Sequence, residues 1–244
     1  MEANPAKFQG ILFKGNKRVT NFNVSVSGQD IEFSKTITAL GICIDENLTF
    51  DKHIDTICLK ASRQISVLQR LTGVLDMPSR KAIYNSFICS NFNYCPLVWF
   101  FTSRASINKM QKLQERALRF VLKDSNSDYE TLLAKSETDS FRISSLKTMC
   151  IEIYKILKGM DPKYLLSLFS KSNVPYEMRD THKLVQPLKR TTGFGIKSFS
   201  YYGSHLWNML PLDLKSAVTL SNFKTLIKKW SGPTCRCSVC TVVI

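Results

Sequence analysis

The sequence predicts an α+β fold in which short antiparallel strands come first and helices follow. Up to Phe50 the chain holds short runs of β-branched and aromatic residues, separated by Gly, Asn, Lys or Ser, which is typical of strands. From Asp51 onward apolar residues recur at spacings of three and four, the period of an amphipathic helix. Strands followed by helices are the α+β pattern.

The first fifty residues contain four strand candidates, with the sequences FQGILF, NFNVSV, DIEFS and TALGICI. Residues 15–18 (GNKR) and 27–30 (SGQD) are the predicted hairpin turns. So few strands make a poor independent sheet. We therefore expect residues 1–50 to be the end of a larger β domain.

A first helix is predicted to begin after Phe50 and to stop at Gly73, with Asn47 or Thr49 as its cap. A second runs from Pro78 to about Asn91, and further helices are expected at 106–122, 128–135, 142–158, 162–170, 199–208 and 221–230. The aromatic segment NFNYCPLVWFF between the second and third helices is expected to be irregular and buried. Residues 171–198 have no clean period and are predicted to form an extended connection. The predicted domains are a β segment at 1–50, a helical domain at 51–125 and a helical C-terminal region at 126–244.

Asp45, Glu46 and His53 raise the question of an acid–base site. Asp45 and Glu46 lie in the turn before the first helix, and His53 lies on its first turn. Acidic residues near a helix start suit the helix dipole. A lone histidine without a partner in the sequence pattern does not make a catalytic pair. The pattern favours a strand turning into a helix over a catalytic dyad.

The basic charge is unevenly distributed. The 244 residues carry a net charge of +15. Residues 1–50 are neutral, with five Lys/Arg and five Asp/Glu; residues 51–125 carry twelve against five, and residues 126–244 seventeen against nine. This excess indicates a polyanionic partner, and nucleic acid is the commonest. A solvated lysine surface is the alternative interpretation.

The third predicted helix has two contrasting faces. At about 100° per residue, five cations fall within about 80° of one another, and apolar residues gather opposite. We call these cations the cationic stripe: Lys109, Lys112, Arg116, Arg119 and Lys123. Like charges on successive turns repel, whereas a run of phosphates would neutralise them and release counterions. The stripe is the predicted nucleic-acid-binding site, and Lys60 and Arg63 of the first helix are weaker candidates. A solvent-exposed basic face is the alternative.

The sequence holds no recognisable catalytic motif: GxxxxGK[ST], GxSxG and HExxH are absent, and no paired aspartates occur. Three C-terminal cysteines, Cys235, Cys237 and Cys240, have a CxCxxC spacing that could hold zinc, although a structural site needs a fourth ligand. A reduced cysteine tail is the alternative.

The N-terminal residues contain no apolar signal-peptide region. The longest apolar run, CPLVWFF, is far shorter than the ~20 residues of a membrane helix. The sequence therefore predicts an intracellular protein of the nucleus or cytoplasm, without a membrane partner. The oligomeric state is left open.

Several stretches, in order, resemble the C-terminal part of reverse transcriptases of LINE-type (non-LTR) retrotransposons, of the jockey/CR1-like kind. They are NPAKFQGILF, TALGICIDENLTFDKHI, SNFNYCPLVWFFTSR with INKMQKLQERALRFVLKD, YETLL, IYKILKGMDPKYL and GSHLWNMLPLDLKSAVTLSNFKTLIKKW. The resemblance spans about residues 4 to 240.

The resemblance implies that residues 1–50 are the end of a palm domain and that residues 51–125 form a thumb. Leu40, Gly41 and Ile42 would lie where such enzymes hold the primer end. The cationic stripe would face the backbone of a template–primer duplex of RNA, DNA or both.

The catalytic aspartates of such a polymerase, which bind Mg in the intact enzyme, would precede Asn4. The resemblance therefore implies a fragment of an RNA-directed DNA polymerase that binds nucleic acid, has no catalytic residues or cofactor of its own and is inactive alone. Two alternatives stay open: a non-catalytic helical protein-interaction module, and a non-functional relic.

Overall fold

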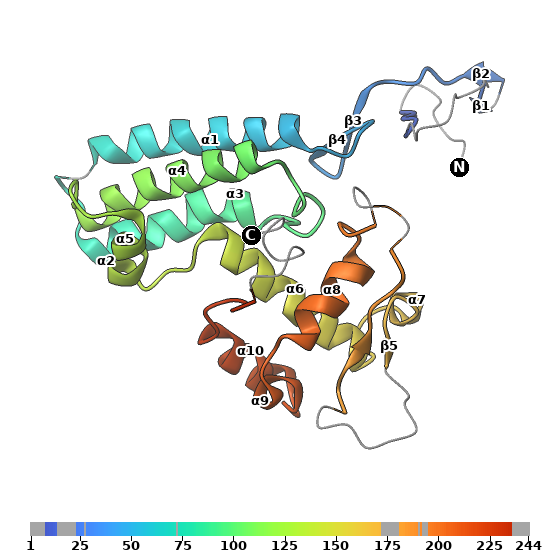
Figure 1. Cartoon of the computed structure of the whole chain (residues 1–244). Helices are drawn as coiled ribbons and strands as arrows, with labels where there is room; N and C mark the ends of the chain where they lie inside the picture. Colours follow the sequence, from blue (N-terminus) through green and yellow to red (C-terminus); the bar gives the residue numbers. More distant parts are fainter. Residues whose placement is uncertain are drawn as a thin grey trace. The chain divides into compact units, whose positions relative to one another are not determined.

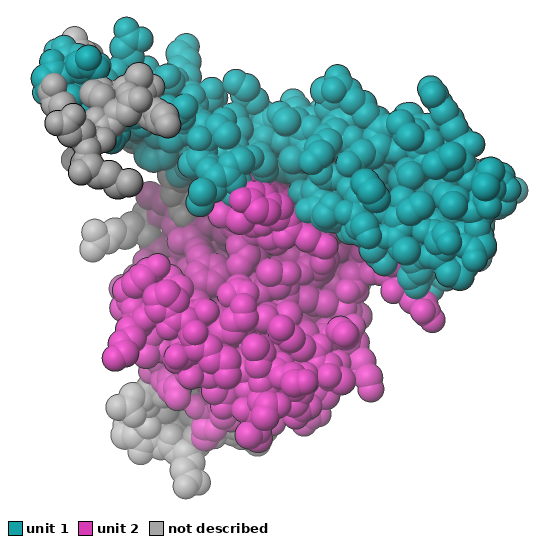
Figure 2. All heavy atoms as spheres, turned by 180° about the vertical axis from the view of Figure 1, so that it is seen from behind, with its two compact units in different colours: residues 1–92, 102–136 teal, residues 93–101, 137–244 magenta. Residues whose placement is uncertain are grey.

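The computed structural model describes residues 8–13, 23–26, 28–71, 73–171, 181–189, 191 and 195–235. It confirms the α+β class, since helices dominate and short antiparallel strand pairs accompany them. Figure 1 shows the order of the elements along the chain. The chain divides into two compact units, coloured separately in Figure 2: unit 1 comprises residues 1–92 and 102–136, and unit 2 comprises residues 93–101 and 137–244. The three domains predicted from the sequence stay a prediction.

The strands of unit 1 form two small hairpins. β1 (Ser25–Val26) pairs with β2 (Gln29–Asp30), and β3 (Thr36–Ala39) pairs with β4 (Ile42–Asp45), both antiparallel. Gly28, at φ 79°, lies in the predicted turn between β1 and β2. The predicted strand at residues 8–13 contributes only a single bridge, from Gly10 to Phe33, and the predicted turn at 15–18 lies outside the described residues.

The stretch TALGICI was predicted to be one strand, and this is wrong. It is a hairpin in which Ala39 lies opposite Ile42, so that Leu40 and Gly41 form a two-residue turn. Both turn residues have positive φ, 49° at Leu40 and 80° at Gly41. That conformation matches the twist of the flanking strands, and Gly41 adopts it without steric cost. The turn was not predicted because Leu40 is apolar and continues the pattern of a strand.

The helices of unit 1 begin and end close to the predicted positions. They are α1 (Asp51–Arg70), α2 (Met77–Ile83), the π-helix η2 (Tyr84–Cys89), α3 (Ser90–Asn93), α4 (Arg104–Leu122) and α5 (Tyr129–Ser136). The second predicted helix is thus a continuous helical run with a π-helical centre. The segment between α3 and α4 is irregular, as predicted, and it buries Pro96, Trp99 and Phe100.

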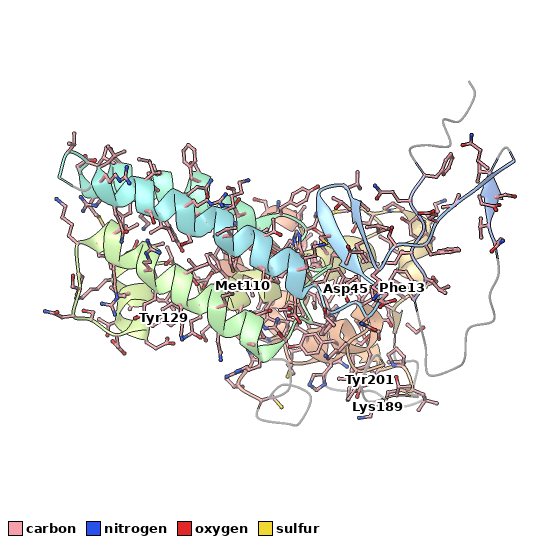
Figure 3. All side chains as sticks on the ribbon, turned by 90° about the horizontal axis from the view of Figure 1, so that it is seen from above. Phe13, Asp45, Met110, Tyr129, Lys189 and Tyr201 are labelled. Carbon is pink, nitrogen blue, oxygen red and sulfur yellow. The ribbon has the colours of Figure 1, made fainter. Side chains whose placement is uncertain are left out.

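Helices α1 and α4 lie side by side in Figures 1 and 3. Their polar contacts follow a parallel register. Asp51 at the start of α1 accepts hydrogen bonds from Ser103 and Ser106 at the start of α4, at 2.8 and 2.7 Å between oxygens. One turn later Asp55 pairs with Lys109. Both helices bury apolar side chains, which include Ile54, Ala61 and Ile65 of α1 and Met110, Ala117, Leu118 and Val121 of α4. The packing of α4 on α1 holds the cationic stripe next to one flank of α1.

Unit 2 is built around α6 (Phe141–Leu157). The other elements are α7 (Lys163–Leu166), β5 (Ser170–Lys171), β6 (Leu184–Val185), α8 (Phe199–Asn208), α9 (Leu212–Lys215) and α10 (Leu220–Lys228). The helix predicted at 162–170 is only four residues long, because the chain turns into β5, which pairs with β6. The sequence pattern did not predict α9.

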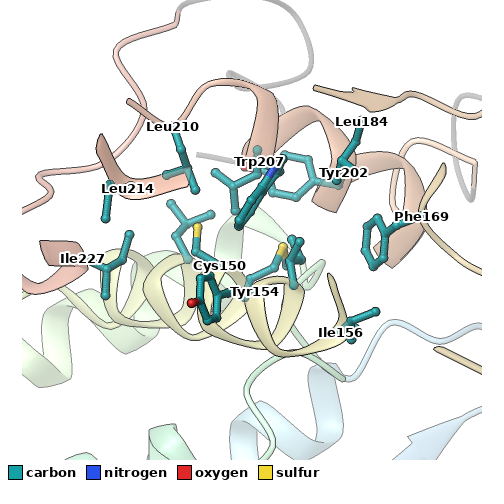
Figure 4. Close-up of a cluster of buried hydrophobic side chains, with 14 of the residues drawn as sticks. Cys150, Tyr154, Ile156, Phe169, Leu184, Tyr202, Trp207, Leu210, Leu214 and Ile227 are labelled. Atoms are coloured by element: carbon teal, nitrogen blue, oxygen red, sulfur yellow. The ribbon is translucent and has the colours of Figure 1, made fainter. Parts of the chain in front are cut away.

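The core of unit 2 lies between α6, α8 and α10, as the close-up in Figure 4 shows. The Tyr154 ring stacks on Phe223, with 4.4 Å between ring centroids, and its hydroxyl donates to the Ala217 carbonyl oxygen at 2.9 Å. Gly203 of α8 packs closely, since a Cβ there would meet Ile153 at 3.1 Å. Among the described residues, no helix has both the length and the apolar character of a membrane span.

Candidate nucleic-acid interface

Asp45 organises the turn that leads into α1. Its Oδ1 accepts hydrogen bonds from the backbone N–H groups of Asn47 and Thr49, both at 3.1 Å, and its Oδ2 accepts from Phe50 N–H at 2.7 Å. Burial alone would raise the pKa of Asp45, but these backbone amides outweigh it and hold the pKa below its ordinary value. A carboxylate with this role is a structural anion rather than a general base.

The N-cap of α1 is not at the predicted Asn47 or Thr49, although Thr49 Oγ1 accepts a long hydrogen bond from the Asp51 backbone N–H at 3.5 Å. The N-cap position is Phe50, at φ 58° and without a side-chain hydrogen bond. The Asp45 carboxylate instead accepts hydrogen bonds from three backbone N–H groups of this turn, those of Asn47, Thr49 and Phe50.

His53 is buried on the first turn of α1. Its Nδ1 accepts a hydrogen bond from the Cys43 backbone N–H at 3.4 Å, so the imidazole links α1 to β4. Burial lowers the pKa of His53 because the charged imidazolium loses its hydration. Asp45 and His53 therefore each have a structural role, which is the interpretation that the sequence favoured.

Two cations of the stripe are paired with acids. Lys109 forms an ion pair with Asp55 of α1, and both side chains are more than half exposed. Arg119 forms an ion pair with Glu115 one turn earlier, at 2.7 Å, and donates to the Ser125 carbonyl oxygen. Exposed pairs of this kind contribute little to stability, but each reduces the net charge of the stripe by one.

Arg116 is held by neutral groups only. Its Nη1 donates to Ser62 Oγ at 3.2 Å, and its Nη2 donates to Ser66 Oγ at 2.8 Å and to Gln69 Oε1 at 3.2 Å. All three acceptors lie on α1, on the flank that faces α4. The guanidinium is therefore fixed in position while its full positive charge is kept. Of its five N–H donors, two form no hydrogen bond with the residues that the structure describes, and they can serve another ligand.

The remaining cations are exposed. The side chains of Lys112 and Lys123 have no hydrogen bond or ion pair with other described residues, and Lys123 ends α4 in the left-handed conformation at φ 54°. Lys60 and Arg63 are also exposed, but neither lines the hollow next to Arg116. Lys60 lies about 150° around α1 from the side chains that hold Arg116.

A hollow of about 550 Å³ lies at the C-terminal end of α4. Three members of the cationic stripe line it, together with neutral groups from α1 and the segment after α4: Gln69, Gly73, Arg116, Arg119, Phe120, Lys123 and Ser125. Periodicity on α4 alone identified the three cations. It missed Gln69 and Ser125, because only the packing of α1 against α4 brings them to the same place.

Leu40, Gly41 and Ile42 form the tip of the β3–β4 hairpin and its first paired residue. Leu40 is 88% exposed, whereas Ile42 is 6% exposed. Leu40 is thus accessible to a ligand, whereas the buried side chain of Ile42 holds the hairpin against the rest of unit 1. Whether it holds a primer end stays a prediction.

The comparisons with known proteins point to one class of protein. A stretch of 85 residues is 26% identical to a protein of Drosophila melanogaster named "Probable RNA-directed DNA polymerase from transposon BS". The stretch covers 34% of this chain and only 9% of that protein. No family model matches the chain, and no solved structure matches it. The similarity suggests a relation to the RNA-directed DNA polymerases of retrotransposons.

The zinc site predicted at the C-terminus lies mostly outside the described residues. Cys235 is half-buried, while Cys237 and Cys240 are not described. Within the described part of the chain, no group of three His, Cys, Asp or Glu side chains is placed to hold a metal ion. Zinc binding stays a prediction.

The arrangement in unit 1 is suited to binding an anion. Arg116 keeps its charge beside a hollow, Lys123 lies at the same end of α4, and Lys112 continues the row. Guanidinium and ammonium groups form charge-assisted hydrogen bonds with phosphate. No acid–base pair accompanies them in the described residues of this hollow, so the chemistry that the arrangement offers is binding.

Proposed function

We propose that this chain is a fragment of a reverse transcriptase of a LINE-type retrotransposon, jockey/CR1-like, and that it binds a template–primer duplex through the sugar–phosphate backbone. The similarity to a transposon RNA-directed DNA polymerase and the order of the motifs support the family. In this proposal α1 and α4 belong to a thumb, and the β3–β4 hairpin belongs to the end of a palm.

The observation that carries the proposal is the hydrogen bonding of Arg116. Because Ser62, Ser66 and Gln69 are neutral, they orient the guanidinium without cancelling its charge. A folding role alone does not require a cation there, since hydroxyl and amide oxygens are also satisfied by neutral donors or by water. A phosphate bound at the hollow would use the two remaining N–H donors and release counterions.

Backbone contacts of this kind select shape rather than base sequence. We therefore expect the chain to bind RNA–DNA and other duplexes of similar geometry with little sequence preference. We also propose that the chain does not transfer nucleotides on its own, because its sequence contains no pair of neighbouring aspartates to hold two magnesium ions. Primer extension with Mg²⁺ tests this point, and incorporation above a protein-free control would contradict it.

Fluorescence anisotropy with an RNA–DNA duplex at several salt concentrations tests the binding. The test variant carries Lys112→Glu, Arg116→Glu and Arg119→Glu. We expect at least about a tenfold loss of affinity and a salt slope reduced by about two to three, since each phosphate contact contributes about one.

The matched control reverses three exposed lysines of unit 2: Lys163→Glu, Lys224→Glu and Lys229→Glu. It changes the net charge by the same amount. Equal losses in the two variants would mean that overall charge alone attracts the duplex, which would contradict a site on α4. A second variant, Lys112→Glu with Lys123→Glu, changes only exposed side chains that form no hydrogen bond or ion pair with described residues, so that a loss of binding there is not expected to come from misfolding.

A further inference from the structure

A second hollow of unit 1 lies between the C-terminal half of α1 and the helical run of α2 and η2. Its volume is about 520 Å³, within the range of ligand pockets. Its lining is almost entirely apolar and includes Val67 and Leu68 of α1, Leu71 directly after α1, Ile83 of α2 and Phe87 of η2. We call it the apolar groove.

The apolar groove leaves large side chains open to water. Val67 is 58% exposed, Phe87 55% and Leu71 43%. Removing the exposed part of each of these hydrophobic side chains from water would be favourable. A cluster of such side chains around a concave surface is typical of an interaction site.

The local structure explains why Phe87 is exposed. η2 is π-helical, with Tyr84 and Ile88 buried, whereas Phe87 belongs to the exposed run of residues 85–87 between them. π-helical segments are rare and often mark functional sites. At the neighbouring turn of α1, Gln64 Oε1 accepts a hydrogen bond from Asn91 Nδ2 at 2.8 Å, which fixes the spacing of the two walls.

The charge around the apolar groove is positive. Between residues 56 and 123 the sequence has eleven Lys/Arg and only two acids, Asp76 and Glu115. Arg63 lines the groove, and Lys60 and Arg70 are exposed on the same helix. The side chains of these three cations have no hydrogen bond or ion pair with the rest of the described chain, so a ligand here meets apolar surface flanked by unneutralised positive charge.

The occupant must therefore combine apolar side chains with negative charge. Arg63, Val67 and Leu71 follow one another at intervals of four along α1, the spacing at which a second helix presents its own side chains. An amphipathic helix lying in a hydrophobic groove uses anchors at i, i+3 or i+4, and i+7. A phosphate backbone is a poor fit, because the apolar lining cannot solvate it.

We propose that the apolar groove docks an amphipathic helix of a partner protein, with apolar side chains against Val67, Leu71 and Phe87 and with Asp or Glu facing Arg63 and Arg70. The groove uses the flank of α1 opposite the one that holds Arg116. The inference is thus independent of duplex binding.

A phage-displayed library of helical peptides, selected on the full-length chain, tests the proposal. The selection includes counter-selection on the Phe87→Glu variant. We expect enriched peptides with apolar residues at helical spacing and acidic residues beside them. In fluorescence anisotropy, the most enriched peptide should bind Val67→Glu and Arg63→Glu at least about tenfold more weakly than the unaltered chain.

The control variant is Val218→Glu, which places the same charge at a valine of unit 2 that is 79% exposed. It should bind the peptide like the unaltered chain. The proposal is overturned if nothing is enriched over counter-selection, if enriched peptides lack acidic residues, or if Val67→Glu binds them normally. Displacement of the peptide by an RNA–DNA duplex would also overturn it, since the groove would then serve nucleic acid. All the substituted side chains are exposed, and circular dichroism checks that each variant is folded.

Discussion

Arg116 of α4 donates a hydrogen bond from Nη2 to Ser66 Oγ of α1 at 2.8 Å, across the contact between the two longest helices of unit 1. The bond does two things at once. It ties α4 to α1, and it aims a charged guanidinium at the hollow near Lys123 without neutralising it. A serine at that place in α1 orients the arginine, whereas an aspartate would cancel its charge.

Substitutions of Arg116 separate its charge from its geometry. Arg116→Lys keeps the charge but loses the planar fork, so we expect duplex affinity to fall roughly fivefold with the salt slope unchanged. Arg116→Met removes the charge as well, and we expect about a tenfold loss and a slope smaller by about one. Anisotropy titrations at low and moderate salt measure both. Identical behaviour of the Lys and Met variants would argue against a phosphate contact.

Asp45→Ala removes the acceptor of three backbone N–H groups in the turn before α1. We expect the free energy of unfolding to fall by about 2 kcal/mol, because one part-buried and two exposed backbone N–H groups lose a charged acceptor. Asp45→Asn keeps one acceptor oxygen and should lose about half as much. Urea denaturation followed by circular dichroism measures both values.

The Asp45 carboxylate also makes the stability of the chain depend on pH in the acidic range. Its pKa is held below the ordinary 3.8 in the folded chain, so its contribution is present above pH 3.8 and is lost as the pH falls through the folded pKa. The stability difference between the unaltered chain and Asp45→Ala should therefore shrink below pH 3.8. A difference that stays constant down to the acid limit would mean that the carboxylate is not the stabilising group.

His53 gives the free energy of unfolding a second dependence on pH. Its direction is opposite to that of a histidine paired with an acid, which stabilises the fold at low pH. Burial lowers the pKa of His53 below the ordinary 6.5, so the unfolded chain binds the proton more readily than the folded one. The free energy of unfolding should fall as the pH drops below 6.5 and level off once the pH lies below the folded pKa. His53→Gln should lose this part of the pH dependence. Thermal unfolding between pH 7.5 and about 5 compares the two proteins, and parallel curves would contradict the prediction.

Zinc at the C-terminal cysteines is tested by metal analysis of the purified chain. If Cys235, Cys237 and Cys240 hold the ion, we expect close to one zinc per chain, and less than about half of that in a triple Cys→Ser variant. Thiol titration gives an independent check, since bound thiolates react slowly. A metal-free chain with three fast-reacting thiols at these positions would exclude the site.

The sequence by itself determined most of the helices of this protein. Spacings of three and four between apolar residues predicted the bounds of α1, α4, α6, α8 and α10 to within about two residues. This works because an amphipathic helix buries its apolar face whatever the tertiary arrangement is. The same periodicity gathered Lys109, Arg116 and Lys123 on one face of α4. The sequence pattern did not predict the Leu40–Gly41 turn or the short helix α9, because elements of two to four residues are too short to show a period.

Only the tertiary structure decided which cations keep their charge. Periodicity cannot show that Asp55 neutralises Lys109 while Ser62 and Ser66 leave Arg116 charged, because those partners lie about fifty residues away and meet α4 only through the packing of α1. The apolar groove has the same origin, since Val67 and Phe87 come together only when α1 and η2 form its two walls. A helix pattern determines which side chains share a face; the packing of helices determines what that face meets.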